Sequence, residues 1–169
     1  MNIIKIRSIW DFISALVLLC NYILIYESFE GHIELPLGTL ITLSLEKLGK
    51  VITGNWYPSI FKRPDCARDC SIFNDGGFVG DKPGFPSGHV AMTSYFAYVI
   101  LFKYFEVTKT NIAIATIAPI IMGFARYYKY CHNIYQIVAG WLLGIGVAYF
   151  IKYIASYKTK TNKDSIKKD

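Results

Sequence analysis

The chain has 169 residues, of which 53% are hydrophobic and 16% aromatic, and it carries a net charge of +6 at pH 7. This composition is more apolar than that of an ordinary soluble domain, so we expect a membrane protein. The charged residues gather outside the apolar segments, above all near the C-terminus, which is typical of a chain beside anionic lipid and does not indicate a nucleic-acid-binding protein.

Apolar segments predict transmembrane helices at residues 9–26, 35–52, 90–105, 112–124 and 134–153. The second segment is the least apolar, because Glu46, Lys47 and Lys50 lie in its last turns. We interpret Glu46 and Lys50 as an intrahelical ion pair near the membrane surface. The predicted fold is an all-α integral membrane bundle of about five transmembrane helices. Its parts are an N-terminal segment with its connecting loop (1–34), a core (35–153) and a basic tail (154–169) that is disordered in solvent or lies beside anionic lipid.

A polar segment of about thirty residues, 54–86, separates the second and third predicted helices. It is rich in Asn, Pro, Asp, Cys and Gly, which favour loops, and loops of that length in compact proteins are usually functional. Lys62-Arg63-Pro64 lies in this segment and Pro86-Ser87-Gly88-His89 closes it. The third helix then crosses the membrane and the fourth returns, so the turn from Arg126 to His132 lies at the same face. Counting spans therefore predicts one polar site at one face of the bilayer.

The residues of this site suit the binding of a phosphate. Ser87 stands at the predicted N-cap of the third helix, so its hydroxyl and the amides of Gly88 and His89 would face an anion at the positive end of that helix. Arg63 and Arg126 supply permanent positive charge and paired donors for phosphoryl oxygens.

Two histidines complete a double-displacement scheme: one attacks phosphorus, while the other protonates the leaving oxygen and later activates water. Gln136 lies four residues after His132, on the same face of the fifth helix. It can therefore accept a hydrogen bond from one ring nitrogen and aim the other at the substrate. The chain has no zinc-ligand spacing, so we expect neither a metal nor another cofactor.

These motifs resemble those of the type 2 phosphatidic acid phosphatase (PAP2) family of integral membrane lipid phosphatases. The family pattern is a lysine followed at seven residues by Arg-Pro, then Pro-Ser-Gly-His, then Ser-Arg, five residues, His, three residues and Asp. The matching segments here are 62–64, 86–89 and 125–136. The resemblance implies that 35–153 is a phosphatase core, that His132 is the nucleophile and that His89 is the general acid. It implies a phosphate held by Lys62, Arg63, Ser87, Gly88 and Arg126.

Three positions depart from that pattern. Trp56 stands where the first lysine belongs. Lys62 lies next to Arg63, and Lys47 and Lys50 lie further back in the preceding segment; of these we assign the role to Lys62. Ala125 replaces the serine and Gln136 the aspartate. However, the sequence Tyr-Cys-His-Asn-Ile-Tyr-Gln-Ile-Val at 130–138 also resembles the dolichyl diphosphate phosphatase branch, where Tyr-x-His-Thr-x-x-Gln-Val occurs. That resemblance implies an active enzyme and a polyprenyl diphosphate substrate.

The predicted function is metal-independent hydrolysis of a lipid phosphate or polyprenyl diphosphate through a phosphohistidine. The alternative is a catalytically impaired membrane protein that binds lipid phosphates or acts as a scaffold, and the missing first lysine favours it. A quinone-linked thiol oxidoreductase would need Cys-x-x-Cys, whereas three residues separate Cys66 from Cys70. These two cysteines form a disulfide if the loop faces an oxidising compartment, or remain free thiols.

The basic tail lies across the membrane from the polar site, so the preference of positive residues for the cytoplasm predicts a site on the non-cytoplasmic face. Lys5 and Arg7 oppose this orientation when all five segments span. A first or second segment that does not cross the membrane would remove the conflict.

Overall fold

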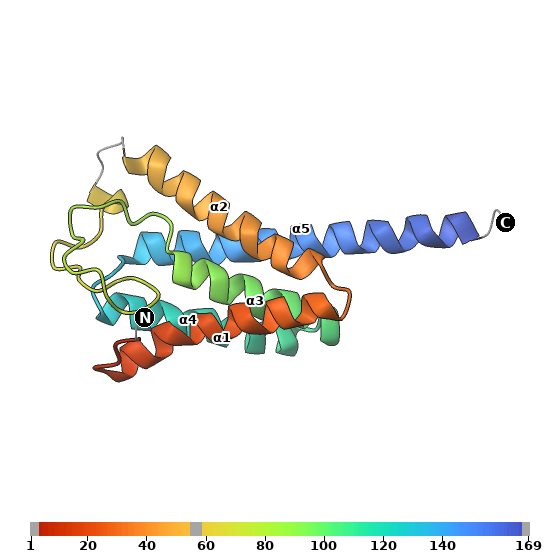
Figure 1. Cartoon of the computed structure of the whole chain (residues 1–169), viewed down its shortest axis with the longest axis horizontal. Helices are drawn as coiled ribbons and strands as arrows, with labels where there is room; N and C mark the ends of the chain where they lie inside the picture. Colours follow the sequence, from red (N-terminus) through yellow and green to blue (C-terminus); the bar gives the residue numbers. More distant parts are fainter. Residues whose placement is uncertain (1–3, 55–58, 167–169) are drawn as a thin grey trace.

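The computed structural model describes residues 4–54 and 59–166, and these ranges form a bundle of five α-helices (Figure 1). A short 3-10 helix, η1, lies in the loop before the third. The helices are α1 (Ile9–Phe29), α2 (Glu34–Gly54), α3 (Gly88–Tyr104), α4 (Lys109–Tyr128) and α5 (Ile134–Ile166), and η1 covers Ser59–Phe61. The predicted all-α fold is confirmed.

Three of these helices are long and apolar enough to cross a membrane. They are α1, α4 and the part of α5 from Ile134 to Tyr157. The chain is thus a membrane protein, as its composition predicted. α2 and α3 coincide with the two other predicted spans, and their crossing of the bilayer stays a prediction.

α4 is longer than the predicted segment. Thr108 caps its first turn by accepting a hydrogen bond from the N–H of Asn111. No glycine or proline lies between residues 124 and 128, and the helix ends shortly before Tyr130, whose φ is +54°. Because the helix continues to Tyr128, Arg126 lies in its last turn and not in the connecting turn as predicted.

α3 lies at the centre of the bundle and packs against all four other helices. Its closest contact is with α5, where two glycines one turn apart let the backbones approach. A Cβ at Gly140 would overlap the carbonyl oxygen of Ser87, and one at Gly144 would overlap that of Ala91. These contacts set the position of the N-terminus of α3 relative to α5.

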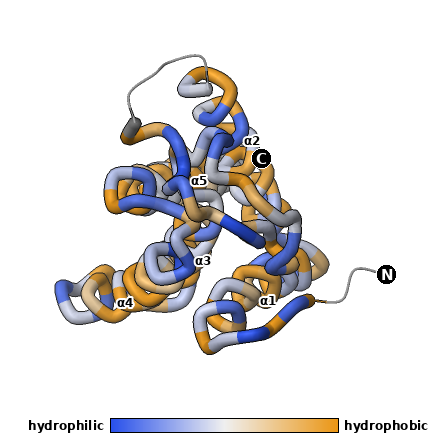
Figure 2. Tube along the Cα trace, turned by 90° about the vertical axis from the view of Figure 1, so that its left-hand side faces the viewer, coloured by the Kyte–Doolittle hydropathy of each residue, from blue (hydrophilic) through white to orange (hydrophobic). Residues whose placement is uncertain are grey.

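The loop before α3, the segment before α1 and the turn between α4 and α5 lie at one end of the bundle, and the C-terminus lies at the other (Figure 1). Figure 2, which shows the bundle from that end, places hydrophilic stretches in the loop and in the segment before α1. The main-chain N–H of Lys5 donates to the carbonyl of Phe73 (3.0 Å), and the side chain of Arg7 forms an ion pair with Asp69 (3.0 Å). Lys5 and Arg7 therefore lie at the loop end, as counting five spans predicted. At the other end, α5 continues through most of the predicted tail.

A disulfide joins Cys70 in the loop to Cys131 in the turn between α4 and α5. The sequence had suggested Cys66 as the possible partner of Cys70, but Cys66 is exposed and free. The correction has a physical reason: the loop folds back over the α4–α5 turn, so Ala67, Cys70 and Cys131 form a small buried cluster.

Candidate active site

A cavity of about 290 Å³, hereafter the polar cavity, lies between α1, α2, α3, the loop and the α4–α5 turn. Four of the predicted site residues line it: Arg63, Gly88, His89 and His132. The loop, α3 and the α4–α5 turn thus bring together predicted site residues that are up to 69 positions apart in the sequence.

The imidazole of His132 is buried and held in one orientation by Gln136. The two side chains meet at 2.9 Å between Nδ1 and Oε1. The Nε2 group of Gln136 donates to the main-chain carbonyls of Ile60 (3.0 Å) and Lys62 (2.6 Å). Because carbonyls only accept hydrogen bonds, these two contacts fix which end of the amide is oxygen, and Nδ1 of His132 must donate to it. The four-residue spacing predicted this contact. Because Nδ1 carries the proton of the neutral ring, Nε2 of His132 keeps a lone pair.

Arg63 contacts the other side of the same ring. Its Nη1 lies 3.3 Å from Nε2 of His132 and donates to the carbonyl of Cys131 at 3.0 Å. Burial, with the charges of Arg63 and Arg126, holds the pKa of His132 well below its usual range. Burial also lowers the pKa of Arg63, and the nearby carboxylate of Glu46 opposes that shift. His132 is therefore a neutral imidazole beside a cation.

The N-terminus of α3 carries two buried polar atoms that point to a ligand. Ser87 precedes the helix and donates its N–H to the carbonyl of Gln136 (2.9 Å), but its hydroxyl makes no capping bond. Across the described residues, neither Oγ of Ser87 nor Nε2 of His89 has a hydrogen-bond partner. Buried polar atoms rarely lack one. A phosphate at this helix end would supply acceptors and a charge that the helix dipole favours.

Arg126 is fully buried in the last turn of α4. Its Nη1 donates to the hydroxyl of Ser14 (3.2 Å) and its Nη2 to the carbonyl of Cys70 (2.7 Å). Its Nε has no partner among the described residues. Arg126 and Ser87 are not among the residues that line the polar cavity.

The lysines of the site differ from the prediction. Lys62 is exposed and does not line the polar cavity, although its carbonyl anchors Gln136. Trp56, at the family's lysine position, lies outside the described residues. Lys47 and Lys50 of α2 do line the polar cavity. Both were alternatives to Lys62 in the sequence, because they precede the loop on the neighbouring helix.

No group of three or more His, Cys, Asp or Glu side chains that could hold a metal ion occurs within residues 4–54 and 59–166. The ionisable groups that line the polar cavity are two imidazoles, one guanidinium, two ammonium groups and the carboxylate of Glu46.

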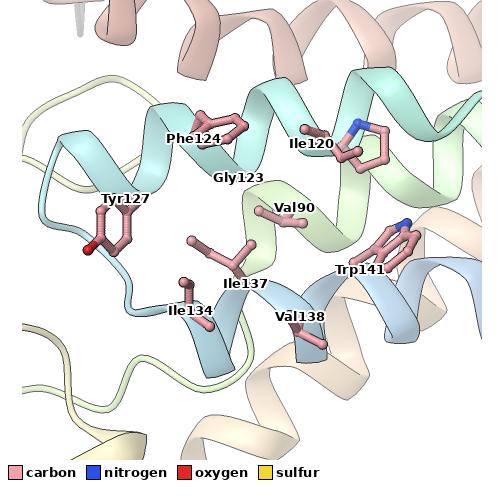
Figure 3. A pocket seen from close by; sticks show the side chains of 10 residues that line it. Val90, Ile120, Gly123, Phe124, Tyr127, Ile134, Ile137, Val138 and Trp141 are labelled. Carbon is pink, nitrogen blue, oxygen red and sulfur yellow. The ribbon is translucent and has the colours of Figure 1, made fainter.

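A second cavity, of about 420 Å³, lies between α3, α4 and α5. Figure 3 shows side chains of α4, among them Phe124 and Tyr127, facing Ile134 and Trp141 of α5 across it. Its lining is apolar and shares no residue with the polar cavity.

Comparison with known families gives one match. The model of the PAP2 superfamily matches residues 32–160, more than half of the chain. The matched region contains the loop, all three motifs and the disulfide. Neither a curated protein nor a solved structure matches the chain.

Proposed function

We propose that this chain, which belongs to the PAP2 superfamily, is a membrane phosphatase that hydrolyses a lipid phosphate or diphosphate through a phosphohistidine at His132. Membership of the family supports a phosphatase-type function in general. The observation that carries the specific proposal is the environment of His132: Nδ1 is bound to Gln136, so Nε2 keeps its lone pair beside Arg63, and His132 lines the polar cavity together with His89.

In the first step, Nε2 of His132 attacks the terminal phosphorus, and the bond from that phosphorus to its leaving oxygen breaks. The leaving oxygen is the lipid oxygen of a monophosphate or the bridging oxygen of a diphosphate. His89, entering in its protonated form, gives its proton to the departing oxygen. A monophosphate substrate releases a lipid alcohol, and a diphosphate substrate releases a lipid monophosphate. His132 becomes cationic as the bond forms, and Gln136 holds Nδ1–H during that change.

In the second step, His89 takes a proton from water, and the resulting hydroxide attacks the phosphohistidine. The bond between phosphorus and nitrogen breaks, which releases inorganic phosphate and restores neutral His132. Both steps pass through a transition state with negative charge on three equatorial oxygens. In this proposal Arg63, which lines the polar cavity, and the N-terminus of α3 stabilise that charge directly, and Arg126, which is buried outside the lining, adds its positive charge.

Two features support a lipid substrate. The polar cavity lies at one end of a bundle in which three helices can cross a membrane, so a headgroup can enter while its chain stays in lipid. Gln136 stands at the position where the family pattern has aspartate. A glutamine at this position is typical of the dolichyl diphosphate phosphatase branch. This residue favours a polyprenyl diphosphate as the substrate.

Two features support a site on the non-cytoplasmic face. Structural disulfides form in oxidising compartments, and the bond between Cys70 and Cys131 lies beside His132. The basic C-terminal segment lies at the opposite end of the bundle, where the cytoplasm would be. Lys5 and Arg7 oppose this orientation, and the charge of Arg7 is neutralised in part by its ion pair with Asp69.

A second candidate is a protein that binds lipid phosphates without turnover. It is favoured by the position of Lys62, which is exposed and outside the polar cavity, so the predicted replacement for the first-motif lysine is not placed to touch phosphate.

The test is release of inorganic phosphate by detergent-purified protein in excess EDTA. The substrates are polyprenyl diphosphate, phosphatidic acid and phosphatidylglycerol phosphate, and His132→Ala and His89→Ala are assayed in parallel. We expect release that EDTA spares and His132→Ala abolishes, together with a base-stable, acid-labile phosphoenzyme in the wild type. Retained lipid binding with no release from any substrate would instead favour the binding protein.

A further inference from the structure

Lys50 is a cationic residue of α2 in the wall of the polar cavity, and an ion pair holds its side chain there. It forms an ion pair with Glu46 one turn earlier, and both residues line the cavity together with Arg63, His89 and His132. The side chain of Lys50 is 27% exposed and that of Glu46 is 10% exposed. A surface pair of this spacing would lie in solvent, whereas this one lies inside the site.

Glu46 places the pair against the end of α3 where phosphate is expected. A Cβ added to Gly88 would lie only 2.8 Å from Oε1 of Glu46, so the carboxylate rests against the first residue of that helix. The ammonium of Lys50, bound to the same Oε1, is thereby held within reach of an anion at the N-terminus of α3. Burying an ion pair usually brings little net stability, so a contribution to binding gives a better reason for its place.

We propose that Lys50 binds a phosphoryl oxygen of the substrate and so takes the part that the missing first-motif lysine plays in the family. The inference rests on the proposed function, because it names a further contact of the same phosphate. An ammonium has three donors, so Lys50 can keep its bond to Glu46 and still donate to the phosphate. Lys50 and Arg63 would then place two cations beside the negative charge that develops on the phosphoryl oxygens in the transition state.

Two other lysines allow the inference to be tested cleanly. Lys47 lines the same cavity from the same helix but is exposed, and Lys62 is exposed outside it. The experiment compares Lys50→Gln and Lys50→Arg with Lys47→Gln and Lys62→Gln. For each variant, kcat and KM for the preferred lipid and the inhibition constant of orthovanadate are measured.

We expect Lys50→Gln to lower kcat/KM and to raise the vanadate inhibition constant, each about 10- to 100-fold, because a charge-assisted hydrogen bond is lost. Lys50→Arg should recover most of this loss, and Lys47→Gln and Lys62→Gln, whose side chains are exposed, should each lose less than Lys50→Gln. A purely structural role would reduce the yield of folded protein without changing the vanadate constant. An unchanged constant in Lys50→Gln, or the full loss in Lys62→Gln, would overturn the inference.

A turnover-free measurement separates this inference from the proposed function. Orthovanadate should raise the melting temperature of the wild type, and Lys50→Gln should remove that rise, whereas Lys47→Gln should reduce it less. If the wild type releases no phosphate from any lipid, the proposed function fails; a vanadate-dependent shift that Lys50→Gln removes would still support Lys50 as an anion ligand. A wild type that vanadate does not stabilise would count against Lys50.

Discussion

Cys70 and Cys131, the two halves of the disulfide, each use a main-chain carbonyl to hold one arginine of the site. The carbonyl of Cys131 accepts from Arg63 at 3.0 Å, and that of Cys70 accepts from Arg126 at 2.7 Å. The covalent bond therefore fixes the spacing of the two carbonyls on which both guanidinium groups depend.

Replacing Cys70 and Cys131 together by serine should loosen both arginines and destabilise the fold. The disulfide closes a segment with a sequence separation of 61, which corresponds to about 4 kcal/mol in the chain-entropy model. We expect a lower melting temperature and a higher KM, measured by thermal denaturation and phosphate release. Cys66→Ser, which removes an exposed free thiol, is the control and should change neither. Equal KM values for the double variant and the wild type would show that the arginines do not need the bond.

Gln136→Glu should destabilise the protein although it keeps the shape of the side chain. A carboxylate cannot donate to the carbonyls of Ile60 and Lys62, so both would lose their bonds to this residue. Each unsatisfied buried group costs about 1–3 kcal/mol. Thermal denaturation measures the loss, and His132→Gln, which keeps those two contacts, is the comparison. A melting temperature of Gln136→Glu at or above that of the wild type would contradict the anchoring role of the amide.

The value of kcat/KM should fall at acid pH, and the midpoint of this fall, the acid limb of the pH profile, should lie below pH 6.5, the ordinary pKa of histidine. Burial and the charges of Arg63 and Arg126 lower the pKa of His132, so its neutral, attacking form persists as the pH falls. The same shift means that the unfolded chain binds a proton below pH 6.5 that the folded chain does not, so the contribution of His132 to stability declines there. Arg63→Gln should move the limb in kcat/KM to higher pH, and Arg68→Gln, in the exposed part of the loop, should not. A limb that stays in place in Arg63→Gln would argue against this origin.

Ser87→Ala should separate binding from stability. The buried hydroxyl has no hydrogen-bond partner among the described residues, so its removal should leave the melting temperature unchanged or slightly higher. If Oγ contacts phosphate, kcat/KM should fall about tenfold. Ser94→Ala is the control, because its hydroxyl donates to the carbonyl of Trp141 and its loss should lower stability instead. Unaltered kcat/KM in Ser87→Ala would remove Ser87 from the binding set.

Gly144→Ala should be strongly destabilising, because a Cβ there would overlap the backbone of Ala91 on α3. A Cβ at Gly146, two residues further along the same helix, would meet no atom within 4 Å, so Gly146→Ala should be neutral or stabilising by up to about 1 kcal/mol. Thermal denaturation of the two variants in one detergent gives the comparison. Similar melting temperatures would mean that α3 and α5 can separate without loss.

The helices were predictable because hydrophobic length is a local property of the sequence. The cluster of Arg63, His89 and His132 was predictable because alternate crossings bring every second connection to the same face. The partner of Cys70 was not, since it depends on how a long loop folds back over the α4–α5 turn. The sequence also could not show that the side chain of Lys50 lines the cavity. Charged residues occur on more than one face of the end of α2, and only the packing of Glu46, the ion-pair partner of Lys50, against Gly88 shows which face meets the site.

The close contact of α3 with α5 also restricts how a substrate can arrive. Backbone atoms fill the space beside Gly140 and Gly144, so a hydrocarbon chain cannot pass between these two helices. The seam is a fixed wall of the bundle, and it holds the N–H of Ser87 against the carbonyl of Gln136 at 2.9 Å. Under the proposed function, the movements that admit a lipid and release its product are therefore expected among α1, α2, α4 and the loop.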